Sequence, residues 1–504
     1  MSDRRVLVIG NGMAGSRFVQ ELVGRDPSVS ITVVGDEPGD AYNRMQLSNV
    51  LAGRTRADTI ALATADWYAA NGVTQIAGRA AVGIDRTARC VELEDGQRLA
   101  YDELVLATGS AAVLPPMAGL ADADGALVDG AVAFRTLDDC ARIASLAASA
   151  RNAVVLGAGV LGIEAARGLA GRGLPVTLVQ RGPRLMERQL DAEAAGILRR
   201  SLADLDVAVS TRRGVRAVRT SGGRVAGVDL DDGTALPCDL LVLCCGVRPR
   251  VSLAVEAGLP VGTGVLVDDA LRSVGDPSVF AIGECAEHDG RTYGLVAPAW
   301  EQARVAAELV GNPSSPLRYR GSSVVTRLKA DGLELAALGD TVDTDADDHD
   351  IVRFSDSGRG VYQKLVVRDG VLVGAILLGD TRTVGTVTQL FDRGAALPAD
   401  RAGLLMVRRN SPVTAALTPT ALPARATICQ CNGVSKSAIC TAWQDGARSV
   451  AEVARRTRAT TGCGTCRDAV DGIVTWLADS DTDQLADTRA NTRANTVANT
   501  VVSA

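Results

Sequence analysis

The strongest constraint on the fold is a glycine-rich turn that occurs twice with the same spacing. The first lies in "RRVLVIGNGMAGSRFVQELV", where Gly10, Gly12 and Gly15 follow the G-x-G-x-x-G pattern between a predicted strand and a predicted helix. The first glycine closes the bend, the second lets backbone amides approach a pyrophosphate, and the third lets helix pack on strand. The helix N-terminus then favours an anion. The stretch predicts a dinucleotide site that includes Ala14, with Asp36 after the next strand as an acceptor for a ribose hydroxyl.

The same pattern recurs in "NAVVLGAGVLGIEAARGLAGRGLPVTLVQRGP", with Gly157, Gly159 and Gly162 in the same context. A lone pattern of this kind is a weak signal, because an ordinary βαβ unit can contain a glycine-rich turn. Here a strand precedes and a helix follows the turn at both places. Two dinucleotide sites in one chain imply two different dinucleotides. We therefore predict an α/β protein with two Rossmann-like dinucleotide-binding domains.

Composition limits the remaining functions. The 504 residues are 47% apolar and 22% charged, which is typical of a globular chain of about three or four domains. The net charge of -6 offers no general attraction to nucleic acid or to anionic membranes. Because the chain begins almost at once with a strand and its apolar runs are short, neither a signal peptide nor a membrane span is expected. We expect a cytoplasmic protein whose 11 cysteines are ligands, redox groups or buried side chains.

Two further strand ends indicate which nucleotides are bound. Between the turns, "YDELVLATGS" is a predicted strand that ends at Thr108 and Gly109, and after the second turn "VFAIGECAEHDG" ends at Gly283 and Glu284. This arrangement resembles the two-dinucleotide flavoprotein reductases. The resemblance implies FAD in the first site and NAD(P)H in the second. It also implies that the Ala-Thr-Gly strand crosses between the domains and that Glu284 contacts the ribityl and phosphate region of the flavin.

The choice between NADH and NADPH depends on a few residues of the second site. Enzymes that use NADH usually end the second strand with an acid, whereas this chain has Gln180 and Arg181, with Arg184 close behind. The arginines could bind a 2′-phosphate or could be solvated surface charges, so both nucleotides remain open. Glu164, on the helix after the turn, is either a contact of the nicotinamide or a partner of the helix dipole.

Disulfide reductases of this family have a Cys-x4-Cys beside the flavin, and related oxidases have one cysteine there. The matching stretch "AYNRMQLSNVLAG" contains no cysteine, so thiol chemistry at the flavin is not expected. The only histidines are His288 and His349, and we expect both in surface loops.

Four cysteines near the end of the chain form the pattern Cys-x-Cys-x31-Cys-x2-Cys. They are Cys429, Cys431, Cys463 and Cys466. Four thiolates are the full ligand set of a 2Fe-2S cluster or of a structural zinc, although gaps of about two to four residues are usual for zinc. Short helices are predicted from Ser435 and from a capping box at Ser449. The spacing resembles the bacterioferritin-associated-ferredoxin-like domain, which implies a 2Fe-2S cluster.

A closer resemblance covers nearly all of residues 4–480. The stretches "YNRMQLSNVLAG", "RLMERQLD", "YGLVAPAWEQA", "VTRLKADGLEL" and "VYQKLVVRDGVLVGAILLGDT" occur in this order. They are similar to the flavin half of NAD(P)H nitrite reductase large subunits and to the electron-transfer subunits of assimilatory nitrate reductases. The resemblance implies that Arg44 contacts FAD and that Trp300 and Glu301 lie near the isoalloxazine ring.

The large nitrite reductases continue with cysteines that hold sirohaem and a 4Fe-4S cluster, but this chain has no cysteine after Cys466. We therefore expect an FAD-dependent NAD(P)H oxidoreductase that passes electrons through a 2Fe-2S cluster to a separate protein. The expected acceptor is a molybdenum nitrate reductase or a sirohaem nitrite reductase. The alternatives are a stand-alone NAD(P)H oxidase or ferredoxin-type reductase, and a reductase that docks on bacterioferritin. A homodimer is compatible with the sequence.

The expected domain order follows from these stretches. An FAD-binding domain in two pieces (1–115 and 239–312) encloses an NAD(P)-binding domain (116–238). A small α+β interface domain (313–407), a Pro- and Ala-rich linker (408–427), the cluster domain (428–480) and a disordered tail (481–504) follow.

Overall fold

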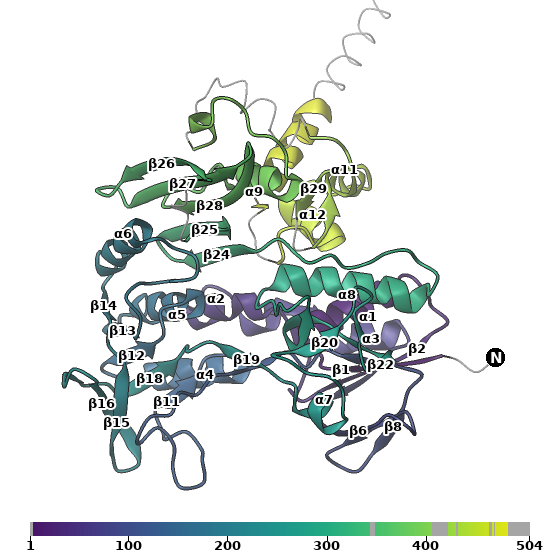
Figure 1. Ribbon diagram of the computed structural model, residues 1–504, viewed down its shortest axis with the longest axis horizontal. Coiled ribbons are helices and arrows are strands. Elements are labelled where there is room, and N and C mark those ends of the chain that lie inside the picture. Colours follow the sequence, from purple (N-terminus) through teal and green to yellow (C-terminus); the bar gives the residue numbers. More distant parts are fainter. Residues whose placement is uncertain are drawn as a thin grey trace, which may run out of the picture. The chain divides into compact units, whose positions relative to one another are not determined.

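The computed structural model describes residues 4–342, 348–405, 422–429, 432–462, 466–467 and 469–481 (Figure 1). The chain forms two compact units, the first of Met1–Thr381 and Phe391–Ala396 and the second of Arg382–Leu390 and Leu397–Ala504. Cys431, Cys463, most of the predicted linker and the tail after residue 481 lie outside the described residues.

The first Rossmann-like domain is built on an eight-stranded sheet with the order β23-β20-β21-β22-β9-β1-β2-β5. The run β22-β9-β1-β2-β5 is parallel, and because both faces of a parallel sheet are covered, β1 and β9 are almost entirely buried. The strands of the sheet are β1 (Arg5–Ile9), β2 (Ser30–Gly35), β5 (Thr74–Ala77), β9 (Glu103–Leu106), β20 (Val265–Val267), β21 (Arg272–Ser273), β22 (Asp276–Ala281) and β23 (Ala286–His288). The helices are α1 (Met13–Val23), α2 (Leu47–Leu51), α3 (Ala65–Ala70), α7 (Ser252–Glu256) and α8 (Val296–Gly311). Short strands complete the domain: β3 (Ala41–Tyr42), β4 (Ala61–Ala63), β6 (Ala81–Asp85), β7 (Cys90–Leu93) and β8 (Arg98–Ala100).

The second Rossmann-like domain has a five-stranded parallel sheet with the order β11-β18-β12-β13-β14. Its strands are β11 (Ala131–Ala133), β12 (Ala153–Leu156), β13 (Val176–Gln180), β14 (Val207–Thr211) and β18 (Leu240–Leu243). Its helices are α4 (Leu137–Ala147), α5 (Val160–Ala170) and α6 (Ala192–Ala203), and an antiparallel sheet of β15 (Val215–Ser221), β16 (Arg224–Leu230) and β17 (Ala235–Leu236) flanks it. The predicted α/β class with two Rossmann-like domains is confirmed.

The two connections between these domains pair with each other. β10 (Ser110–Ala112) directly follows the Ala-Thr-Gly segment and runs antiparallel to β19 (Val247–Pro249), the segment that returns from the second domain. Thr108 reinforces the pairing, because its Oγ1 donates a hydrogen bond to Arg250 O at 2.7 Å. The Ala-Thr-Gly strand therefore crosses between the domains, as the resemblance implied.

A third layer is a five-stranded antiparallel sheet with the order β24-β25-β28-β27-β26, drawn in green in Figure 1. Its strands are β24 (Val325–Ala330), β25 (Leu333–Gly339), β26 (Asp350–Asp356), β27 (Val361–Arg368) and β28 (Val371–Leu378). Buried side chains of this sheet, such as Leu335 and Ile376, share one apolar cluster with Ile163 of α5 and Leu198 of α6. The sheet therefore packs on the second Rossmann-like domain.

In the second unit, β29 (Thr427–Cys429) pairs with β30 (Val434–Ser435), and α11 (Lys436–Gln444) and α12 (Val450–Thr457) follow. Residues 469–481 are also helical, and α9 (Val384–Arg393) spans the boundary of the two units in sequence. Ser435 caps α11 as expected. Ser449 caps α12, but the Glu452 carboxylate accepts from the Arg448 amide, so the predicted capping box is only half formed.

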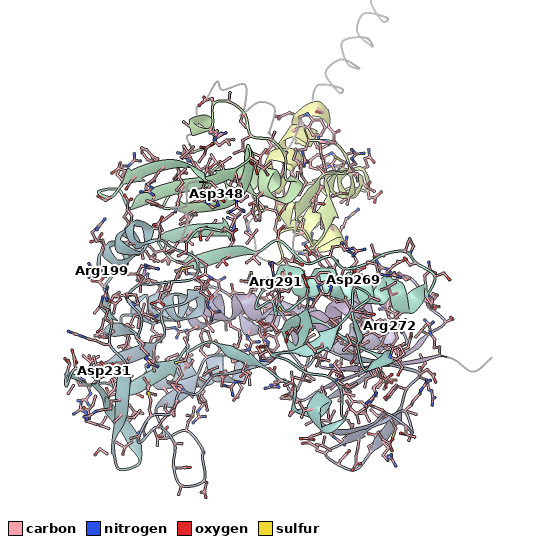
Figure 2. All side chains as sticks on the ribbon, viewed as in Figure 1. Arg199, Asp231, Asp269, Arg272, Arg291 and Asp348 are labelled. Carbon is pink, nitrogen blue, oxygen red and sulfur yellow. The ribbon has the colours of Figure 1, made fainter. Side chains whose placement is uncertain are left out.

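The expectation of a surface loop is wrong for His288. This residue ends β23 and is 5% exposed, and its Nε2 lies 3.0 Å from Oδ1 of Asp269, which is labelled in Figure 2. His288 is buried because it lies within β23 of the sheet, and the Asp269 carboxylate provides a hydrogen-bond partner for its Nε2.

A buried ion pair fastens the third sheet to the second Rossmann-like domain. Lys364 on β27 is 2% exposed, and its Nζ lies 3.1 Å from Asp191 Oδ2 and 3.2 Å from Thr341 O. The same Oδ2 accepts a hydrogen bond from Tyr362 at 2.6 Å, while Asp191 also caps α6 through the amide of Ala194. Two of the stretches quoted for the family resemblance, "RLMERQLD" and "VYQKLVV", therefore meet at this joint.

Replacing Asp191 with Asn should destabilise the protein by about 3 kcal/mol, because the buried Lys364 ammonium loses its countercharge. Burial opposes the charge of Asp191, but hydrogen bonds from Tyr362, Ala194 and Lys364 outweigh it and lower the pKa of this carboxyl. The stabilisation is therefore present above the ordinary pKa of Asp and is lost as pH falls through the lowered folded pKa. Thermal unfolding of wild type and D191N at several pH values measures this, and the difference should shrink in acid.

Glu193→Gln is the matched control, since Glu193 lies 3.6 Å from Arg353 and both side chains are more than 40% exposed. Its loss should cost no more than about 0.5 kcal/mol. Equal effects of the two substitutions would contradict the role of the buried pair.

Candidate functional site

The first glycine turn packs the backbone that follows β1 against the residue that follows β9, next to the N-terminus of α1. Gly10 has φ +111°, and a Cβ on it would lie 2.1 Å from Ala107 O. A Cβ on Gly15 would lie 1.9 Å from Gly10 O, so both positions require glycine. Gly12 differs, because no atom lies within 4 Å of the place that its Cβ would take. The turn therefore faces open space at Gly12, where the amides of α1 can reach an anion.

The second turn repeats this geometry almost atom for atom. Gly157 has φ +103° and its Cβ would lie 2.3 Å from Cys244 O, while a Cβ on Gly162 would lie 1.8 Å from Gly157 O. Gly159, like Gly12, has no atom within 4 Å of its Cβ position. Both turns thus present the same open amide-lined face, as their common spacing predicts.

The sequence-predicted residues of the first site come together from distant parts of the chain. Gly283, with φ +78°, begins the 3-10 turn η3 (Gly283–Cys285), and a Cβ on it would lie 2.9 Å from the Ala14 Cβ. Ala107 adjoins both Gly10 and Gly15, so Thr108 and Gly109 follow directly from the turn. The segments around Ala14, Thr108 and Gly283 therefore meet at one edge of the sheet.

A polar cluster that the sequence did not predict surrounds Glu284. Its Oε2 accepts hydrogen bonds from Ser110 Oγ at 2.5 Å and from the Arg135 guanidinium. Arg135 also donates to Ser110 Oγ at 2.8 Å, and its backbone carbonyl accepts from Arg44 Nη1 at 2.9 Å. Arg135 and Ser110 are absent from the sequence-predicted site. Arg135 follows β11 without any motif, and only the fold brings it to Glu284.

Two acidic residues after β2 are each paired with an arginine. Asp36, the predicted ribose acceptor, lies 2.6 Å from Arg250 Nη1. Glu37 accepts from Tyr42 at 2.6 Å and from the guanidinium of Arg44. Arg44, predicted to contact FAD, thus stands between Glu37 and the Arg135 carbonyl, next to the Glu284 cluster.

Trp300 and Glu301 lie in the first turns of α8. Trp300 is 4% exposed, and its indole Nε1 donates to Met13 O at 2.9 Å, with the Arg17 guanidinium 5.5 Å from the ring centroid. Glu301 Oε2 accepts from Ser322 Oγ at 2.5 Å. Trp300 therefore packs α8 against α1 at the first glycine turn.

At the second turn, Gln180 is directed at the backbone instead of at solvent. Its Oε1 accepts from the Ala158 amide at 2.9 Å, so the side chain supports the turn itself. Arg181 is exposed, and Arg184 and Glu164 are partly buried. Burial raises the pKa of Cys244, and the neighbouring Cys245 and Glu164 raise it further. This thiol therefore stays protonated, as a core cysteine should.

Two of the four expected cluster ligands lie in the described part of the second unit. Cys429 is fully buried and Cys466 is 5% exposed, and the amide of Thr460 donates to Cys466 Sγ at 3.3 Å. Amide donors to sulfur are typical of iron–sulfur ligation, so these residues fit the group. The described residues contain no group of three metal-binding side chains, and Cys431 and Cys463 lie outside them.

Comparison with known proteins agrees with this geometry. Residues 4–308 match the model of the pyridine nucleotide-disulphide oxidoreductase family, residues 325–395 match the rubredoxin NAD+ reductase C-terminal domain, and residues 427–476 match the BFD-like [2Fe-2S] binding domain. The chain belongs to the pyridine nucleotide-disulphide oxidoreductase family. It is an NAD(P)H oxidoreductase, and its cofactors besides NAD(P)H are FAD and a 2Fe-2S cluster.

Two relatives from Bacillus subtilis are each 34% identical to the chain. One is a nitrite reductase [NAD(P)H], aligned over 96% of this chain and 59% of its own length. The other is an assimilatory nitrate reductase electron transfer subunit, aligned over 97% of this chain and 62% of its own. The chain thus spans about three fifths of the length of these relatives. Rhodocoxin reductase from Rhodococcus erythropolis is 36% identical over 61% of this chain and 72% of its own.

Solved structures support the fold. The covalent putidaredoxin reductase–putidaredoxin complex superposes with a TM-score of 0.73 at 24% identity, over 82% of this chain and 98% of that one. A ferredoxin reductase from Rhodopseudomonas palustris gives 0.71 at 25% identity, over 79% and 98%.

Across the residues that the structure describes, no helix has the length and apolar character that a bilayer crossing requires.

The glycines of the first turn offer a paired test of structure against binding. Gly10→Ala should destabilise the protein by at least about 2 kcal/mol, since the methyl would strike Ala107 O at a strained φ. Gly12→Ala meets no protein atom, and because Gly12 is the N-cap of α1 the variant should lose no more than about 1 kcal/mol of apoprotein stability. It should nevertheless lower FAD occupancy at least tenfold, measured from the visible spectrum, because the methyl fills the open face of the turn.

Gly196→Ala, in α6, is the control, because its Cβ also has free space but lies away from either turn. This variant should keep its FAD and be about 0.5–1 kcal/mol more stable, because alanine favours the helix interior. Full FAD content in the Gly12 variant would count against the first turn as the flavin site.

Proposed function

We propose that this chain is an electron-transfer flavoprotein that oxidises NAD(P)H and supplies electrons to a separate assimilatory nitrate reductase or sirohaem nitrite reductase in the cytoplasm. The observation that carries the proposal is the combination of two open glycine turns in one unit with two buried cysteines, Cys429 and Cys466, in the other. The relatives named for nitrite reduction and for nitrate-reductase electron transfer support this acceptor class.

The first turn is the proposed FAD site. Its proposed contacts are Gly10, Gly12, Ala14, Gly15, Asp36, Arg44, Thr108, Gly109, Gly283, Glu284 and Trp300, and we add Arg135 to this proposal. Arg135 holds the Glu284 carboxylate through a direct ion pair and through Ser110, so Glu284 is oriented before any ligand binds. Glu301 accepts a hydrogen bond from the Ser322 hydroxyl.

The second turn is the proposed NAD(P)H site, with Gly157, Gly159, Gly162, Glu164, Gln180 and Arg181. Gln180 fixes the turn through the Ala158 amide, which leaves the amide-lined face at Gly159 for the pyrophosphate. When bound, FAD accepts a hydride from NAD(P)H and can give up electrons singly, and a 2Fe-2S cluster carries one electron at a time. Cys429, Cys431, Cys463 and Cys466 are the proposed ligands of that cluster.

A second candidate is a ferredoxin-type reductase that delivers electrons to a small redox partner. It is favoured by the 36% identity to rhodocoxin reductase. That alignment covers 61% of this chain, whereas the nitrite and nitrate relatives also align through the BFD-like domain. A chain with its own cluster domain has less need of a separate ferredoxin, so the first candidate is preferred.

Cys466→Ser should separate flavin reduction by NAD(P)H from electron delivery to the catalytic partner. The variant should keep anaerobic bleaching of the flavin by NADH or NADPH at the wild-type rate but lose the rhombic EPR signal and at least 90% of electron delivery, as expected when one of four ligands is lost. Delivery is measured as nitrate- or nitrite-dependent oxidation of NAD(P)H with added catalytic partner. The three readouts come from one purified sample.

Cys440→Ser is the matched control, because Cys440 lies within α11 of the same domain and outside the four-cysteine pattern. It should retain the EPR signal and the transfer rate. A wild-type protein with stoichiometric zinc and no EPR signal would rule out the electron relay, and unchanged transfer in the Cys466 variant would assign electron delivery to the flavin alone.

A further inference from the structure

The loop after β13 is bonded to the second glycine turn through both peptide groups of Ala158. The Ala158 amide donates to Gln180 Oε1 at 2.9 Å, and the Ala158 carbonyl accepts from the Met186 amide at 3.0 Å. Leu185 and Met186 are 1% and 2% exposed, so the loop is anchored in the core at this point. Glu187, the next residue, is therefore held beside the turn.

The carboxylate of Glu187 lies over Gly182, two residues beyond the end of β13. A Cβ on Gly182 would be 1.6 Å from Glu187 Oε1 and 2.7 Å from Oε2, so the carboxylate fills the space that a side chain would need. Its Oε1 accepts from the Arg184 backbone amide at 3.3 Å and lies 3.5 Å from Gln180 Nε2. Both are neutral donors, and the described part of the chain provides no ion pair for Glu187.

The position of Glu187 matters because NAD-binding Rossmann folds use an acid near the end of the second strand. The usual acid stands at the end of the second strand and accepts a hydrogen bond from the adenosine ribose 2′-hydroxyl. Gln180 occupies that place here, but its carbonyl oxygen is engaged by Ala158. We propose that Glu187 supplies the missing carboxylate and selects NADH over NADPH, by accepting the ribose hydroxyl and repelling a 2′-phosphate. The inference depends on the proposed binding of NAD(P)H at the second turn.

The nearby arginines are the competing influence, because they could attract a 2′-phosphate. Arg213 is already paired with Asp232 at 2.8 Å. The Cγ atom of Arg181 lies 3.9 Å from the position that a Cβ on Gly214 would take, so this side chain lies beside Gly214. Asp231, labelled in Figure 2, accepts the Gly214 amide at 2.9 Å at the same turn and partly offsets that charge. A 2′-phosphate at Gly182 would instead meet the Glu187 carboxylate at contact distance, where like charges repel most strongly.

The test compares the rates of anaerobic flavin reduction by NADH and NADPH, expressed as kcat/KM. Wild type should prefer NADH at least tenfold, and Glu187→Gln should reduce this preference at least tenfold, by losing activity with NADH and gaining it with NADPH. Gly182→Ala should shift the preference in the same direction, because its methyl displaces the flexible end of Glu187. Asp204→Asn, at the exposed end of α6, removes one negative charge from the same domain and should leave the ratio within twofold.

Wild-type preference for NADPH, or an unchanged ratio in Glu187→Gln, would overturn the proposal. Calorimetry measures the affinities for 5′-AMP and adenosine 2′,5′-bisphosphate without turnover. It therefore distinguishes failure of the Glu187 proposal from failure of the proposed function. Tighter binding of 5′-AMP, reversed in Glu187→Gln, supports the role of Glu187 even if neither coenzyme reduces the flavin. Equal binding of the two ligands, or binding of neither, would overturn it.

Discussion

The close approach of each glycine turn to the strand beside it is the contact on which the rest of the first unit depends. A Cβ on Gly10 or Gly157 would lie 2.1 or 2.3 Å from the carbonyl oxygen of Ala107 or Cys244, so only glycine allows the backbone to approach these carbonyls. Only this approach places the N-termini of α1 and α5 over the carboxyl ends of their sheets, where open α/β sheets bind ligands.

The stretches that resemble nitrite and nitrate reductases serve largely to hold these edges in position. Asp191 and Lys364 come from two such stretches and form the buried joint between the second Rossmann-like domain and the third sheet. Trp300, from a third stretch, braces α8 on α1 through Met13 O. A family resemblance therefore identifies an assembly of layers more directly than it identifies the groups that touch a cofactor.

Local patterns predicted the βαβ units and the helix caps, because glycine spacing, apolar runs and capping serines act over a few residues. They could not predict Arg135, which meets Glu284 across 149 positions of the chain without any motif. They also misplaced His288, because a polar residue at a strand end looks the same in sequence whether it is exposed or is buried with a hydrogen bond to a carboxylate such as Asp269. Gln180 was predicted as a ligand contact, yet its side chain is bonded to the turn itself, which only the fold reveals.

The two glycine turns differ in how their acids are neutralised, although their backbones match. At the first turn Asp36, Glu37 and Glu284 each face an arginine, so the charge of each carboxylate is balanced by a cation. At the second turn Glu187 accepts hydrogen bonds from two amide groups, and the described residues provide no cation against it. A carboxylate of this kind attracts hydroxyl donors and repels anions, so the proposed role of Glu187 is to separate NADH from NADPH by the charge beside the adenosine ribose.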